Sequence, residues 1–255
     1  MLKEAWKKLS WSVAQRGVWG TLRVALRRAV SGETTDGPVE HVFDREFGVE
    51  TSGFIGAWKL GGRGPNQRYS NPYYGVPPSR LCEALRRWRQ MVEDEGRAVE
   101  EFAFVDIGCG KGRAMMIASE MPFREVVGLE LSGELVEIAQ RNFERWRQLG
   151  RGRSRLEVME GDATMMPLPP GPWLIFMYNS FQAPVMRTML ERLETVAGES
   201  AGTMDLLYFV PSQEAVFMEF PRFARVWSEV IPLSEEDASV DRVSSPEDRC
   251  SLYRR

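Results

Sequence analysis

Residues 105–112 read Val105-Asp106-Ile107-Gly108-Cys109-Gly110-Lys111-Gly112, and this stretch decides the fold. An apolar run over residues 102–107 leads into it, and a helix over about residues 113–120 is predicted to follow. Glycine lets the backbone turn tightly and approach a ligand that a side chain would block. A strand, a glycine-rich turn and a helix in this order are the setting in which such turns bind nucleotides.

The same alternation continues along the chain. Strands are predicted at residues 102–107, 126–131, 155–160, 173–178, 203–210, 223–230 and 249–253. Helices are predicted over residues 79–94 and 113–120, from Ser132 to just before Gly150, and after Pro184. Strands that alternate with helices form a parallel sheet through right-handed crossovers. We therefore expect an α/β fold with a doubly wound, mostly parallel, seven-stranded sheet and a ligand site at the carboxyl ends of its strands.

The spacing of the glycines separates two families of cofactor site. A dinucleotide fold uses G-x-G-x-x-G, but Arg113 stands where the third glycine belongs, which disfavours a NAD-dependent oxidoreductase. G-x-G-x-G with Asp106 two residues before the first glycine resembles motif I of class I S-adenosylmethionine-dependent methyltransferases. The resemblance spans about residues 102–210. From residues 43–53 onward the layout is also similar to an uncharacterised group of bacterial methyltransferases.

This resemblance implies a Rossmann-like methyltransferase fold with an N-terminal helical and irregular extension, and S-adenosylmethionine as cofactor. Glu130 ends the second predicted strand, where a carboxylate can accept hydrogen bonds from both ribose hydroxyls; the alternative is a glutamate that merely begins a loop. Asp162 matches the family's acceptor for the adenine amino group, unless it only caps a turn. The predicted cofactor site is Asp106, Gly108, Cys109, Gly110, Glu130, Leu131, Gly161, Asp162, Ala163 and Tyr178.

The acceptor end of the site is predicted at Tyr178-Asn179-Ser180-Phe181. Amine-modifying members of the family often carry Asn/Asp-Pro-Pro-Tyr/Phe here, and this chain lacks the prolines. The segment is more similar to the Asn-Asn-Phe arrangement of the non-SET histone-lysine methyltransferases. That similarity implies catalytic roles for Asn179 and Tyr178 and a wall of the methyl channel at Phe181. The alternative for Asn179 is a residue that stabilises the turn.

Two tyrosines are expected to complete the substrate pocket. Tyr73 and Tyr74 lie with Tyr69 and Asn71 in an irregular segment before the predicted sheet, and such segments often cover the cofactor in this fold. The alternative is that these rings pack on the sheet edge.

Methyl transfer is an in-line displacement in which the protein aligns the reactants and excludes water. A hydroxyl acceptor needs a base, whereas an amine needs only to be neutral. The single histidine, His41, lies outside the predicted sheet and is expected to be structural. We therefore favour an amine of a small molecule or a protein. An O-methyltransferase and a non-catalytic methyltransferase-like binding module remain alternatives.

The charge is unevenly distributed. Residues 1–30 carry +6, which leaves −9 for the remainder, and an acidic body argues against nucleic acid as a partner. We divide the chain into a basic amphipathic helical segment with a linker (1–38), an irregular lid with a helix (39–98) and the cofactor-binding domain (99–255). Trp6, Trp11 and Trp19 accompany the basic residues, so contact with an anionic membrane is one reading of residues 1–30, and packing on the body is the other.

Composition also bears on metals and location. The three cysteines, Cys82, Cys109 and Cys250, are too widely spaced for a zinc site, so no metal is expected. No stretch approaches the roughly 20 apolar residues that span a bilayer. We expect a cytoplasmic protein, with membrane association through residues 1–30 as the open alternative.

Overall fold

The computed structural model describes Trp6, Val13 and residues 40–61, 64–198, 204–241, 243–245 and 248–255. Met1–Val39 and Glu40–Arg255 form two compact units. Trp6 and Val13 are helical, and the remaining residues of the helices and linker predicted for residues 1–38 lie outside the described residues. The elements below all belong to the second unit.

A seven-stranded sheet forms the centre of this unit, as predicted. Its strands are β3 (Ala103–Ile107), β4 (Glu125–Glu130), β5 (Leu156–Glu160), β6 (Trp173–Tyr178), β7 (Met204–Phe209), β8 (Ala224–Val230) and β9 (Arg249–Arg254). The order across the sheet is β5-β4-β3-β6-β7-β9-β8. Strand β9 runs antiparallel to both neighbours, and the pairs from β5 to β7 are parallel.

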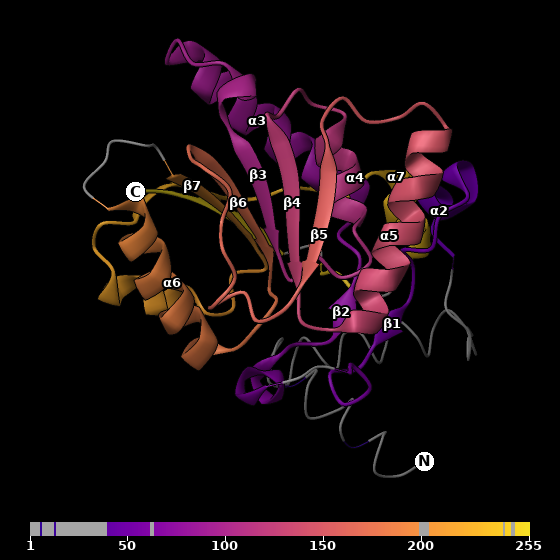
Figure 1. The fold of residues 1–255 in the computed structure, drawn as a ribbon, viewed down its shortest axis with the longest axis horizontal. Helices are drawn as coiled ribbons and strands as arrows, with labels where there is room; N and C mark the ends of the chain where they lie inside the picture. The colour runs from indigo at the N-terminus through magenta and orange to yellow at the C-terminus, as the bar shows by residue number, and fades with distance from the viewer. Residues whose placement is uncertain are drawn as a thin grey trace. The chain divides into compact units, whose positions relative to one another are not determined.

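Helices cover both faces of the sheet. On one face, α3 (Pro78–Asp94), α4 (Arg113–Ser119) and α5 (Gly133–Gln148) share an apolar cluster with alternate strand residues such as Phe104 and Phe176. On the other, α6 (Ala183–Ala197) and the 3₁₀ helix η3 (Glu214–Glu219) pack on the intervening residues, such as Val105 and Ile175. Figure 1 shows α6 on the side of the sheet opposite to α4 and α5. Strands buried on both faces read as continuous apolar runs, which is why their positions were predictable.

The sheet order reverses between β3 and β6. From β3 the chain moves outward through β4 to β5, and it then returns to the other side of β3 with β6. Helices that leave two adjacent strands on opposite faces open a crevice at the carboxyl ends of those strands. The glycine-rich turn follows β3 at this crevice, and residues 179–182 follow β6 there.

The segment before the sheet contains short elements rather than only irregular chain. These are α2 (Val42–Phe47), β1 (Phe54–Ile55), the 3₁₀ helix η1 (Pro65–Tyr69) and β2 (Tyr73–Tyr74), with β1 and β2 pairing antiparallel. The 3₁₀ helix η2 (Val99–Glu101) precedes β3, and the helix α7 (Glu235–Val240) lies between β8 and β9.

Ser132 shows where local pattern and structure differ. It occupies the position before the first residue of α5, as predicted, but its hydroxyl makes no helix-capping bond. The hydroxyl oxygen is buried without a hydrogen-bond partner among the described residues. Instead the Ser132 backbone N–H donates to the Glu130 carboxylate at 2.8 Å. The Glu130 carboxylate thus accepts a hydrogen bond from the backbone at the start of α5.

A buried ion pair ties the segment before the sheet to the glycine-rich turn. The Asp44 carboxylate accepts hydrogen bonds from the backbone of Thr51 and Ser52 at 2.6 Å and also from the Thr51 hydroxyl. It lies 3.7 Å from the guanidinium of Arg113, the first residue of α4, and both side chains are buried. Arg113 also donates to the Thr51 hydroxyl at 2.6 Å.

Removing Asp44 should therefore destabilise the whole unit. A buried ion pair that loses one partner leaves an uncompensated charge, so Asp44→Ala is expected to lower the free energy of unfolding by about 3–5 kcal/mol. Urea unfolding followed by tryptophan fluorescence measures this change. The control is Glu46→Ala in the same helix, where the side chain is exposed and the expected change is within about 0.5 kcal/mol. Similar values for the two variants would contradict this account of the ion pair.

Candidate functional site

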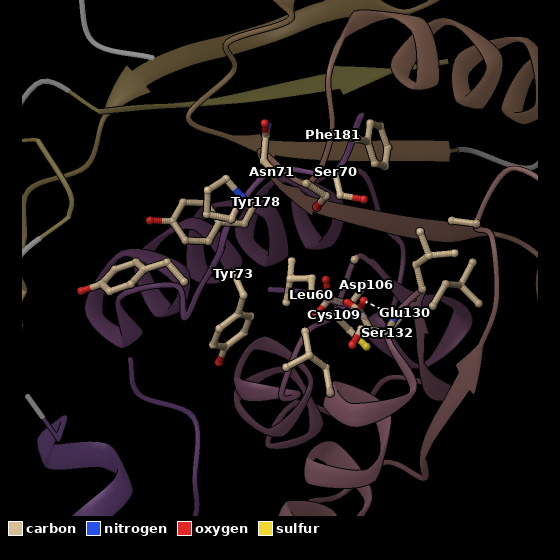
Figure 2. A pocket seen from close by; sticks show the side chains of 18 of the residues that line it. Leu60, Ser70, Asn71, Tyr73, Asp106, Cys109, Glu130, Ser132, Tyr178 and Phe181 are labelled. Atoms are coloured by element: carbon tan, nitrogen blue, oxygen red, sulfur yellow. Dashed lines mark hydrogen bonds between the residues drawn. The ribbon is translucent and has the colours of Figure 1, made fainter. Parts of the chain in front are cut away.

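One cavity lies at the carboxyl edge of the sheet and gathers side chains from distant parts of the chain. Its wall includes most of the residues predicted for the site: Tyr73, Tyr74, Asp106, Gly108, Cys109, Glu130, Leu131, Gly161, Asp162, Ala163, Tyr178 and Phe181. Figure 2 shows Asp106, Cys109, Glu130 and Ser132 close together on one side of this cavity. Gly110 and Asn179 are the two predicted site residues that are absent from the wall.

The glycine-rich turn is packed against other parts of the site. Gly108 has φ +77°, and a Cβ there would meet the Ser180 side chain at 2.7 Å. The Ser180 hydroxyl donates to the carbonyl of Ile107 at 2.6 Å, which holds the end of β6 against the turn. Gly110 has φ +55°, and a Cβ there would lie 2.3 Å from the Tyr73 ring. Positive φ and close approach both require glycine at these two positions.

Glu130 is fixed at the end of β4 by two backbone donors. Its Oε2 accepts from the Gly110 N–H at 2.9 Å and its Oε1 from the Ser132 N–H at 2.8 Å, and the side chain is buried. Burial raises the pKa of the Glu130 carboxyl, and the backbone N–H groups of Ser132, Gly110 and Leu131 act in the opposite direction. A carboxylate offers about four acceptor positions, so one remains on each oxygen. Two free positions on neighbouring oxygens suit a vicinal diol.

Asp106 is the most deeply buried acid of the cavity. It is 2% exposed, and its carboxylate has no hydrogen bond within the described part of the chain. Burial raises the pKa of Asp106 well above its ordinary value, and the nearby Glu130 carboxylate raises it further. Burial also raises the pKa of Cys109, so this thiol stays protonated and acts as a packing residue.

Aromatic rings form much of the opposite wall. The Tyr73 hydroxyl donates to the Thr51 carbonyl at 2.6 Å, and the Tyr178 hydroxyl lies 3.5 Å from the Ser244 hydroxyl. In Figure 2 both hydroxyls point away from Asp106 and Glu130. Burial raises the pKa of Tyr73 and of Tyr178 well above the ordinary value. The cavity is therefore lined by the tyrosine rings, and their protonated hydroxyls are held outside it.

Asn179 follows β6 with a left-handed backbone, φ +47°. Its amide oxygen accepts from the Ser212 hydroxyl at 2.5 Å and from the Asn71 amide at 3.2 Å. These contacts are those of a residue that stabilises a turn, the alternative given above. The amine-orienting role implied for Asn179 would require its side chain to leave both partners.

His41 lies outside the cavity wall and is 7% exposed. Its Nδ1 accepts from the backbone N–H of Phe43 at 3.0 Å, which caps the start of α2. Its Nε2 lies 3.1 Å from the carboxylate of Asp237 in α7. The imidazole thus joins two helices, as expected of a structural histidine.

Seven further polar residues line the cavity and are not among the predicted site residues: Asn66, Gln67, Ser70, Asn71, Arg113, Ser132 and Ser180. Arg113 drew attention only as a departure from the dinucleotide pattern. Ser180 adjoins predicted residues, which was a usable signal. Asn71 lies in the segment that was expected to cover the cofactor. Asn66 carries no signal, because an asparagine in an irregular segment is common in any turn.

The chain was compared with protein families, curated proteins and solved structures. Residues 104–198 match the family model described as a methyltransferase domain. A search of curated proteins found no match. Among solved structures, the fold is similar to that of glycopeptide N-methyltransferase MtfA in complex with S-adenosylmethionine, at 12% identity and a TM-score of 0.50, over 71% of this chain and 95% of that one.

A second solved structure is magnesium protoporphyrin IX methyltransferase (ChlM) from Synechocystis PCC 6803 with bound S-adenosylmethionine. It has 12% identity and a TM-score of 0.47, over 68% of this chain and 78% of that one.

The buried acid should make stability depend on pH. Because burial raises the Asp106 pKa, the folded protein keeps a proton that the unfolded chain releases above about pH 4. The free energy of unfolding therefore falls as pH rises from there through the folded-state pKa. Asp106→Asn lacks this titration. We expect it to be more stable than the parent near pH 8, with a difference that shrinks toward about pH 5. Parallel urea-unfolding profiles for the two proteins across that range would contradict the assignment.

Proposed function

We propose that this chain, whose residues 104–198 match a methyltransferase domain, is a class I S-adenosylmethionine-dependent methyltransferase that transfers the methyl group to an amine nitrogen. The predictions of an enzyme and of S-adenosylmethionine as its cofactor are confirmed, which removes the NAD-dependent alternative. The observation that carries the proposed site is a single cavity in which Glu130, Asp106 and Asp162 meet around the glycine-rich turn.

The donor set of the cavity fits an adenosyl cofactor. Glu130 has one free acceptor position on each oxygen, which suits the two ribose hydroxyls. Asp162 lies at the carboxyl end of β5 and suits the adenine amino group. Asp106 keeps a carboxyl without internal partners at the end of β3, where it suits the ammonium group of the methionine part. Charge-assisted hydrogen bonds of this kind are the stronger class.

When bound, the cofactor supplies a methyl group already activated by positive sulfur. The protein then has to align the acceptor and exclude water. Tyr73, Tyr178 and Phe181 present apolar ring surface to the cavity, and all three belong to segments at the sheet edge where the acceptor enters. A desolvated wall of this kind favours the neutral form of an amine, which is the nucleophilic form.

The same wall disfavours a hydroxyl acceptor, which needs a base. Among the described residues of the wall, burial raises the pKa of Tyr73, Tyr178 and Cys109, so none of these is an anion. Glu130, Asp106 and Asp162 are assigned to the cofactor. His41, the one histidine in the chain, lies outside the wall. An amine is the acceptor that these groups support, and it belongs to a small molecule or a protein.

Membrane contact and cellular location stay predictions. The membrane contact of residues 1–30 falls outside the described residues apart from Trp6 and Val13, and the cytoplasmic location is untested. In the described part of the chain, no helix combines the length and apolarity that crossing a bilayer demands.

Loss of the Glu130 carboxylate should weaken cofactor binding. Two charge-assisted hydrogen bonds are removed, so Glu130→Ala is expected to raise the dissociation constant of S-adenosylhomocysteine roughly 10–100-fold in calorimetry. The matched control is Glu157→Ala, an exposed glutamate on the neighbouring strand β5, which should bind as the parent does. Unchanged affinity of Glu130→Ala would reject the ribose assignment.

NMR of labelled products identifies the atom that accepts the methyl group. The purified protein is incubated with a cell lysate and S-adenosylmethionine labelled with ¹³C in its methyl group, and products are examined by NMR. We expect the labelled methyl signals to have the carbon chemical shift of N-methyl groups and to be missing with Asp106→Ala. O-methyl signals that depend on the intact protein would overturn the amine proposal.

A further inference from the structure

A strap from the segment before the sheet crosses the cavity. It comprises residues 60–61 and 64–74, and nine of these residues line the cavity together with Asp162 and Tyr178: Leu60, Gly61, Asn66, Gln67, Ser70, Asn71, Pro72, Tyr73 and Tyr74. The strap therefore belongs to the site and is not only a connection to α3.

The later half of the strap is fixed by its backbone. Ser70 forms a bridge with Phe181, and the Gln182 N–H donates to the Tyr69 carbonyl at 2.9 Å. The Asn71 N–H donates to the Ser180 carbonyl at 3.0 Å. Figure 2 shows Ser70 and Asn71 beside Phe181. Backbone bonds to the segment after β6 hold this half in one register regardless of side chains.

The earlier half is held at the other side of the cavity through one side chain. The Asn66 amide nitrogen donates to Asp162 Oδ2 at 2.8 Å and reaches the Thr164 hydroxyl at 3.4 Å. Asp162 Oδ1 accepts from the Thr164 N–H at 2.9 Å and from its hydroxyl at 2.7 Å. The contact thus joins the strap to the residue that we assign to adenine.

Asp162 and Asn66 each keep an unfilled hydrogen-bond acceptor position. A carboxylate offers about four acceptor positions, and three on Asp162 are filled, two on Oδ1 and one on Oδ2. The amide oxygen of Asn66 accepts no hydrogen bond from the described residues, and the side chain is half-buried. One carboxylate position and one amide oxygen are therefore available side by side, facing a common cavity.

We infer that Asn66 is a cofactor-binding residue, whose amide oxygen shares the adenine amino group with Asp162. An exocyclic amino group has two N–H donors, one for Oδ2 of Asp162 and one for the Asn66 oxygen. The Asn66 nitrogen, by donating to Asp162, fixes the amide so that its oxygen is the atom left for the ligand. This inference rests on the proposed function, because it takes an adenosyl ligand as given.

The inference predicts that the site distinguishes adenine from hypoxanthine. S-inosylhomocysteine carries a carbonyl where S-adenosylhomocysteine carries the amino group, and that carbonyl would face two acceptors without a donor. Asn66 should therefore favour the amino compound and disfavour the carbonyl compound. A strap that only covered the cavity would affect both compounds equally.

The test measures binding of both compounds by calorimetry, and dissociation rates by stopped flow, for the parent, Asn66→Ala and Arg68→Gln. Arg68 is an exposed residue of the same 3₁₀ helix that does not line the cavity, so its variant should match the parent. We expect Asn66→Ala to bind S-adenosylhomocysteine about 3–10-fold more weakly, the effect of one lost hydrogen bond. The preference for this compound over S-inosylhomocysteine should shrink by a similar factor.

Two results would overturn the inference about Asn66, and a third would overturn the proposed function. If Asn66→Ala weakens both compounds equally, or neither, Asn66 does not contact the base and the inference is overturned. If the parent binds neither compound, the proposed function itself fails. Asn66→Asp is a second probe: it keeps the side-chain size but places a carboxylate against Asp162, so it should weaken S-adenosylhomocysteine more than Asn66→Ala does. Thermal unfolding of each variant verifies that it is folded.

Discussion

The carboxylate of Glu130 joins the two halves of the proposed cofactor site. One oxygen takes the N–H of Gly110, in the turn after β3, and the other takes the N–H of Ser132, at the start of α5. Both donors are backbone groups, so the arrangement depends on the path of the chain rather than on flexible side chains. The turn can approach Glu130 only because its glycines accept positive φ. A buried acid is unfavourable unless it is hydrogen-bonded, and these bonds stabilise it while leaving positions for a ligand.

Side-chain contacts bind the segment before the sheet to the glycine-rich turn. Arg113 and Lys111, next to the glycines, reach back to that segment: Arg113 to Thr51 and Asp44, and Lys111 to Glu50 at 2.9 Å. The Tyr73 ring then lies against Gly110. Lys111 in the motif and Arg113 just after it thus hold the segment that covers the turn. This coupling gives a physical reason for an arginine where a dinucleotide-binding turn would have glycine.

The strands and the glycine-rich turn were predictable because their signals are local. Each of the seven strands begins and ends within one residue of its predicted position. The buried parallel strands β3, β4, β6 and β7 are short apolar runs between turns. Glu130 and Asp162 could be found because Glu130 ends β4 and Asp162 lies just after β5. The directions of side chains were not predictable in this way. Whether Asn179 points at the acceptor or at Ser212, and whether Asn66 meets Asp162, is decided by contacts between segments 30 to almost 100 residues apart. Ser132 has the sequence of a helix cap, yet a neighbouring carboxylate takes its backbone N–H.

The central claim is that an adenosyl cofactor lies in the cavity between Glu130 and the strap. The most direct measurement is a crystal structure of the protein with S-adenosylhomocysteine. The account predicts electron density in this cavity, with the ribose hydroxyls on Glu130 and the adenine between Asp162 and Asn66. Density for the ligand elsewhere, or a cavity filled by protein side chains while the ligand is bound, would contradict it.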